Sequence, residues 1–110
     1  MVAKLRLESV SSRPLQRRTR RVSRMVAHSE VGIRCNQGHA STAVLRDVST
    51  FGCALDSEEG WLRTGMFLTI TPADGWTIQA ILRWVCNGRA GAEFLRPISQ
   101  ADARELSGGE

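Results

Sequence analysis

The sequence predicts an all-β protein in which six short antiparallel strands close into a barrel, followed by a short C-terminal α-helix. Short segments with β character recur between Arg21 and Leu95, turn signals separate them, and the pattern changes after Pro97. The chain of 110 residues has the usual length of one domain, and its 42% of hydrophobic residues suffice for a core. This length excludes a large enzyme in which two domains meet over a cleft.

Apolar and polar residues alternate loosely along each predicted strand. The first strand is predicted in two parts, 22–27 and 31–35, which are separated by polar residues. The other five strands are predicted at 40–46, 52–55, 66–71, 76–84 and 90–95. Alternate residues from Trp76 to Trp84 share one face of the longest strand. We therefore expect both tryptophans in the core or at the rim of the barrel.

Turn signals and a helix signal complete the predicted architecture. The turns are predicted at Asn36-Gln37-Gly38, Ala73-Asp74-Gly75 and Asn87-Gly88. Asn-Gly is a strong signal for a two-residue hairpin, because both residues tolerate positive φ. Residues 99–102 have the form of a capping box, and residues 101–106 favour a helix that Gly108-Gly109 ends.

The positive charge is concentrated at the N-terminus. Residues 1–24 hold eight Lys and Arg against Glu8, or +7, and residues 25–110 hold seven Arg against ten Asp and Glu, or −3, which gives the net +4. Arg outnumbers Lys fourteen to one, and a guanidinium recognises phosphate or guanine edges bidentately where an ammonium does not. A bias in the composition of the coding sequence is the alternative explanation for the excess of Arg over Lys. The basic segment predicts an anionic partner that is bound there.

Several classes of protein are not expected from this sequence. We expect no membrane span and no secretory signal, since no long apolar run and no apolar segment after Lys4 and Arg6 is present. Three widely spaced cysteines argue against a disulfide framework and favour the cytoplasm. Cys35, His39, Cys53 and Cys86 are a conceivable zinc set, but buried apolar thiols are the expectation, with no metal and no catalytic residues.

Two short motifs carry the candidate chemistry. The first is the run from Arg17 to Arg21, with an Arg-x-x-x-Arg spacing at Arg17 and Arg21 and a second such spacing at Arg20 and Arg24. The second is Asp47-x-Ser49-x-x-Gly52 between two predicted strands. Taken separately, the first is typical of a solvated basic run and the second of a polar turn.

In this order, with 26 positions from Arg21 to Asp47, the motifs resemble those of the PilZ domain family. That family has Arg-x-x-x-Arg in an N-terminal loop, followed after the next hairpin by Asp/Asn-x-Ser-x-x-Gly. The resemblance extends to about residue 106. It implies a PilZ-type six-stranded barrel that binds cyclic di-GMP as a receptor and is not an enzyme. The implied ligand-binding residues are Arg17, Arg21, Asp47, Ser49 and Gly52, with Gln16, Arg18 and Arg20 as possible additions.

The chemistry of this ligand suits those side chains. Cyclic di-GMP carries two phosphates and two guanines, and guanidinium groups pair with phosphate and with the O6/N7 edge of guanine. A carboxylate such as that of Asp47 accepts from the guanine N1 and N2 donors, and Ser49 hydrogen-bonds phosphate or base. Gly52 permits close approach of the backbone. The arginine loop would become ordered over the ligand, at an entropic cost.

We accordingly predict a flexible basic tail at 1–16 and a PilZ-like domain at 17–107, in a monomer that signals through a downstream protein partner. Two alternatives remain open at this stage. The first is a small basic barrel that binds nucleic acid through its arginine-rich arm, although the acidic body makes nucleic acid a less favoured partner. The second is a PilZ-like adaptor that binds protein only.

Overall fold

A computed structural model of the protein describes residues 24–108. They form seven strands and one helix: β1 (Met25–Val26), β2 (Glu30–Cys35), β3 (Ala40–Val48), β4 (Gly52–Asp56), β5 (Phe67–Ala73), β6 (Trp76–Cys86), β7 (Arg89–Phe94) and α1 (Gln100–Leu106). Each of these elements lies within a few residues of its predicted position. Within residues 24–108, no helix has the length and apolar character needed to cross a bilayer.

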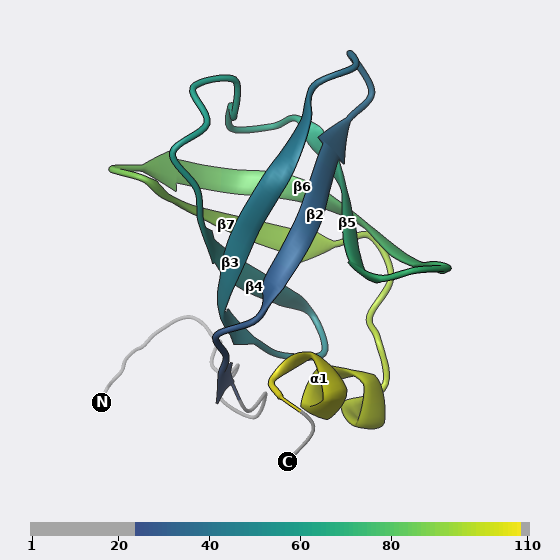
Figure 1. Cartoon of the computed structure of the whole chain (residues 1–110). Coiled ribbons are helices and arrows are strands. Elements are labelled where there is room, and N and C mark those ends of the chain that lie inside the picture. The colour runs from purple at the N-terminus through teal and green to yellow at the C-terminus, as the bar shows by residue number, and fades with distance from the viewer. Residues whose placement is uncertain (1–23, 109–110) are drawn as a thin grey trace, which may run out of the picture.

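The strands close into a six-stranded antiparallel barrel, as predicted. The order β3-β2-β5-β6-β7-β4 becomes a ring because β4 also pairs with β3 (Figure 1). Met25 of β1 pairs with Val48 at one end of β3, and Glu30 of β2 pairs with Val44 further along it. β1 and β2 therefore form a single interrupted strand position beside β3, which is the interruption that the sequence indicates.

Alternate side chains from every strand of the ring fill the interior of the barrel. Leu45, Leu55, Leu68, Ile70 and Leu82 are the largest fully buried aliphatic side chains. The hairpin between β6 and β7 has the predicted form, because Asn87 and Gly88 both have positive φ, 51° and 79°. A turn with two positive φ values matches the twist of the flanking strands.

The helix α1 covers one end of the barrel (Figure 1). Ser99 is its N-cap, and the Ser99 hydroxyl accepts from the backbone N–H of Asp102 at 2.9 Å. Ala103 and Leu106 are buried, and Leu106 belongs to the same core cluster as the barrel interior. Just before α1, the N–H of Ile98 donates to the carbonyl of Thr50 at 2.8 Å, which ties this segment to the turn between β3 and β4.

Three β-bulges alter the alternation of side chains in the wall of the barrel, and the one in β5 lies between Ile70 and Ala73. The pairing register shifts between Leu45 and Asp47 in β3, and between Leu82 and Trp84 in β6. An extra residue in one strand turns the residues after it to the other face. Leu82 is therefore buried while Trp84 is 44% exposed. The expectation that Trp84 continues the inward face of Leu82 is wrong, because alternation does not reveal a bulge.

Candidate ligand-binding face

Small residues form the floor of the outer surface over β4 and β7, which we call the β4–β7 face. Ala54 of β4 pairs with Gly91 of β7. A Cβ atom at Gly52 would lie 2.4 Å from the carbonyl oxygen of Ala92, and one at Gly91 would lie 2.1 Å from Nε1 of Trp84. A side chain at Gly52 would therefore displace the backbone of β7, and one at Gly91 would displace the indole of Trp84, which packs directly on that backbone.

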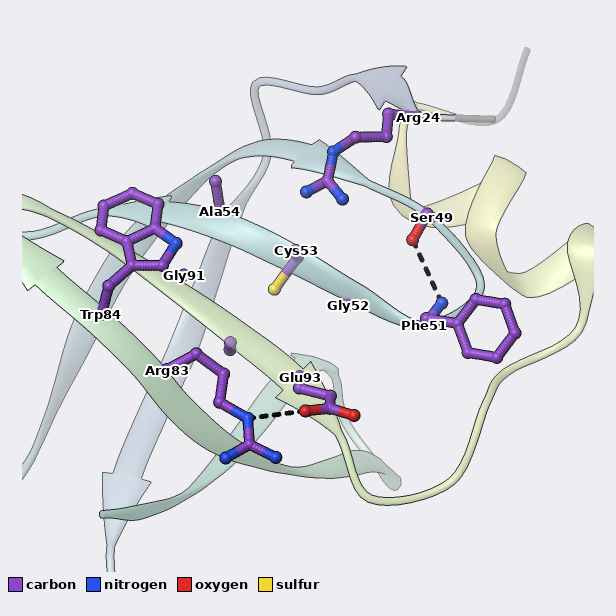
Figure 2. A pocket seen from close by; sticks show the side chains of 11 residues that line it. Arg24, Ser49, Phe51, Gly52, Cys53, Ala54, Arg83, Trp84, Gly91 and Glu93 are labelled. Carbon is purple, nitrogen blue, oxygen red and sulfur yellow. Dashed lines mark hydrogen bonds and ion pairs between the residues drawn. The ribbon is translucent and has the colours of Figure 1, made fainter. Parts of the chain in front are cut away.

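A hollow of about 340 Å³ lies on this face, and we call it the first hollow. Arg24 borders it where the described chain begins, Arg83 and Trp84 border it from β6, and Glu93 borders it from β7 (Figure 2). The N–H of Nε in Arg83 donates to Oε1 of Glu93 at 2.6 Å. The first hollow thus combines cationic groups, an aromatic ring and a floor of backbone.

The turn that connects β3 to β4 carries the motif Asp47-x-Ser49-x-x-Gly52. Ser49 is 1% exposed, and its backbone N–H donates to the carbonyl of Gly52 at 2.8 Å. The Ser49 hydroxyl accepts from the N–H of Phe51 at 3.1 Å (Figure 2). Ser49 and Gly52 both line the first hollow, so the motif shapes the turn and presents it to the hollow at the same time.

Asp47 forms an ion pair with Arg24. One terminal nitrogen of the Arg24 guanidinium donates to Oδ1 of Asp47. The side chains are 54% and 35% exposed, so this pair is accessible to a ligand. Arg24 belongs to the alternative Arg20/Arg24 spacing of the arginine motif.

The structure brings together three of the five residues that the family resemblance implies, namely Asp47, Ser49 and Gly52. The remaining predicted positions lie outside the described residues: Gln16, Arg17, Arg18, Arg20 and Arg21. The register of the arginine motif therefore stays a prediction.

Cys53 lies at the floor of the first hollow and is chemically inert. Burial, and secondarily the Asp47 carboxylate, raise the pKa of the Cys53 thiol to about 12, although Arg24 acts in the opposite direction. A protonated thiol is neither a nucleophile nor a metal ligand at neutral pH. Cys35 is buried and Cys86 is exposed. Across residues 24–108, no three His, Cys, Asp or Glu side chains gather in a way that holds a metal ion.

Sequence reasoning missed four residues on the β4–β7 face. Arg83 and Trp84 reach it through the bulge in β6, Arg46 reaches it through the bulge in β3, and Arg89 reaches it through its position in β7. Nε of Arg46 lies 3.3 Å from Oδ2 of Asp56, and Nε of Arg89 donates to Oδ1 of Asp56 at 3.0 Å. A local motif search has no signal for these residues, because only strand pairing brings them together.

The solved structures that are similar to this chain include a PilZ domain and an inhibitor of motility. The PilZ domain of CeSA from a cellulose-synthesizing bacterium is 23% identical, with a TM-score of 0.58, over 76% of this chain and 94% of that one. The Bacillus subtilis inhibitor of motility MotI/DgrA is 20% identical, with a TM-score of 0.57, over 84% of this chain and 49% of that one. No family model and no curated protein matches the sequence. The likeness shows that the protein has the fold of a PilZ domain.

Proposed function

We propose that this protein is a receptor for cyclic di-GMP, which binds on the β4–β7 face. The observation that carries this proposal is the convergence of Arg24, Ser49 and Gly52 on the first hollow, with Asp47 paired to Arg24 at its edge. Asp47, Ser49 and Gly52 match the second motif that is characteristic of cyclic di-GMP receptors in the PilZ family, Arg24 belongs to the alternative arginine spacing, and the barrel is of the PilZ type.

The face offers a complementary group for each part of the ligand. Arginines neutralise phosphate and form bidentate hydrogen bonds with it. Trp84 presents a partly exposed aromatic ring, and a purine gains about 1–3 kcal/mol by stacking on an aromatic side chain. The carboxylate of Asp47 accepts from guanine N1 and N2. An ionised carboxylate has about four lone-pair sites, so Asp47 is able to hold guanine and Arg24 together.

Few residues of the chain separate the arginine run from Arg24, which borders the first hollow. Arg21 precedes Arg24 by three residues, and three residues span at most about 11 Å. The chain length therefore permits a side chain at position 21 to contact a ligand in the first hollow. We infer that Arg17 and Arg21 close over the ligand and that the arm becomes ordered when they do so. The entropy lost in this ordering lowers the net affinity.

The proposed output is a contact with another protein. Two ligand phosphates reduce the positive charge of the face and of the arm, which changes the surface that a partner meets. No catalytic step is part of this proposal. The protein acts in the cytoplasm in this account, because the proposed ligand is a bacterial second messenger.

Titration calorimetry with cyclic di-GMP, GTP and a single-stranded oligonucleotide tests this proposal. We expect saturable binding of cyclic di-GMP alone, weakened at least tenfold in Asp47→Ala. Asp74→Ala is the matched control, because Asp74 is an exposed carboxylate in the β5–β6 turn, and it should bind like the wild type. Preference for the oligonucleotide would support the nucleic-acid alternative. Binding of none of the three would overturn the proposal and leave the protein-only adaptor.

A further inference from the structure

A second hollow of about 360 Å³ adjoins the first on the β4–β7 face. It shares Ala54 and Trp84 with the first hollow, and Arg46, Arg89 and His28 also border it. Trp84 therefore stands between two hollows that both carry arginine side chains. Asp47 of the PilZ-type motif borders the second hollow, whereas Ser49 and Gly52 of the same motif border the first.

The strand register places the two hollows on opposite sides of one row of residues. Asp47, Ala54, Gly91 and Trp84 pair in sequence across β3, β4, β7 and β6. Along β7, Glu93 lies two residues to one side of this row and Arg89 two residues to the other side. Four residues of a strand span about 13 Å. The face is thus long enough to bind an anion on each side of the indole.

Arg46 and Arg89 share one carboxylate. Both approach Asp56 through Nε, at 3.3 and 3.0 Å. Their side chains are 40% and 51% exposed. Within residues 24–108, their terminal guanidinium nitrogens make no hydrogen bond to protein atoms. Asp47 borders the same hollow and is paired with Arg24, so three arginines face two carboxylates and leave a positive charge in excess. Asp56 directs the planar donor groups of Arg46 and Arg89, whose outer nitrogens suit phosphate.

We propose that Arg46 and Arg89 form a second phosphate-binding subsite of the cyclic di-GMP site, on the far side of Trp84. The inference rests on the proposed function and extends it. The subsite takes a phosphodiester group attached to a purine, with the purine against the indole and the phosphate between the two guanidinium groups. Asp56 is the positioning residue, since it holds both Nε atoms and leaves the outer nitrogens for the ligand.

A purely structural role for these arginines predicts a different result. Ion pairs as exposed as these contribute little to folding, so their removal has little effect on stability. Ligand binding separates the two roles, because a lost charge-assisted bond to phosphate weakens it by about tenfold or more.

Calorimetric titration of cyclic di-GMP into Arg46→Gln, Arg89→Gln and the double variant tests the subsite. Arg34→Gln is the matched control, because Arg34 is exposed on β2, which is not a neighbour of β4, β6 or β7 in the ring. We expect each single variant to bind at least tenfold more weakly, or to lose one of two binding events, and Arg34→Gln to stay within twofold of the wild type. Thermal unfolding verifies that the variants fold, and Arg89→Lys should fall between wild type and Arg89→Gln.

Failure of the proposed subsite and failure of the proposed function give different experimental results. If the wild type binds and Asp47→Ala does not, while Arg46→Gln and Arg89→Gln match Arg34→Gln, the subsite is refuted and the proposed function stands. If the wild type itself fails to bind cyclic di-GMP, both are refuted.

Discussion

At the scale of single residues, the shape of the β4–β7 face depends on two glycines, which have no side chain. Gly52 lets β4 approach β7 closely, and Gly91 lets the Trp84 indole rest on the backbone. The backbone of a strand moves less readily than the end of a side chain. The two glycines therefore differ in what their replacement disturbs: Gly52 controls the spacing of two strands, and Gly91 controls the position of one aromatic ring.

Gly52→Ala should destabilise folding by about 1–3 kcal/mol, the usual cost of overpacking. The added Cβ would meet the carbonyl oxygen of Ala92 at 2.4 Å, so the strands must separate. Gly60→Ala is the control, because no atom lies within 4 Å of its added Cβ, and it should change stability by less than about 1 kcal/mol. Urea unfolding measures both. Equal stability of the two variants would contradict the close contact of β4 and β7.

At the scale of elements, the bulges in β3 and β6 decide which side chains lie on the β4–β7 face. Without the shift in β6, Trp84 would continue the buried face of Leu82, and the β4–β7 face would lose its aromatic ring. Bulges are common next to binding sites because they redirect side chains. The turn between β3 and β4 is positioned in a different way, by the Ile98–Thr50 hydrogen bond from the segment before α1.

Ser99→Ala should destabilise folding by about 1 kcal/mol, the typical cost of losing an N-cap. The Ser99 hydroxyl accepts from the N–H of Asp102, and alanine leaves that donor without this partner. Ser99→Asp supplies another acceptor and should remain within about 0.5 kcal/mol of the wild type. Urea unfolding of the three proteins is the measurement, and a Ser99→Ala variant as stable as Ser99→Asp would contradict the capping role.

The elements were easier to predict than the face they build. The Asn87-Gly88 turn, the Ser99 cap and the strands have local signals, and each is present in the structure. Asp47, Ser49 and Gly52 also lie within six residues, so one motif identifies them. Arg46 and Arg89 converge on Asp56 through strand pairing over tens of residues. No local pattern encodes that pairing, and the bulge that exposes Trp84 is equally invisible to alternation.

At the scale of the whole molecule, charge is separated along the chain. The first 24 residues carry +7 and the remainder carries −3. An anionic ligand on the β4–β7 face would join the basic arm to the barrel. In the proposed mechanism the arm would lose conformational entropy on binding, so the arm and the barrel would contribute to affinity in different ways.

Arg17→Ala and Arg21→Ala should each weaken cyclic di-GMP binding by about 1.5–3 kcal/mol, the range for a charge-assisted hydrogen bond. Unfolding by urea should not change, because both residues precede the barrel. Arg20→Ala removes the same charge from within the same run and should have a smaller effect. If Arg20→Ala and Arg24→Ala weaken binding while the first two variants do not, the arginine motif has the other register.

Deletion of residues 1–12 should leave binding of cyclic di-GMP within about tenfold of the wild type, a change of no more than about 1.4 kcal/mol. These residues precede both motifs, so the deletion separates the arginine run from the rest of the basic tail. Calorimetry on the shortened chain is the measurement. A larger loss would assign part of the site to the tail itself.

Competition between cyclic di-GMP and cyclic di-AMP at matched salt tests the central claim most directly. The two ligands carry the same two phosphate charges, so contacts to phosphate alone would hold them equally. Adenine presents an amino donor where guanine has O6, and it lacks the N1 and N2 donors from which we propose that Asp47 accepts. Each polar group left unpaired costs about 1–3 kcal/mol. We predict a preference for cyclic di-GMP of at least about a hundredfold, reduced in Asp47→Ala, whereas equal affinities in the wild type would contradict guanine recognition on this face.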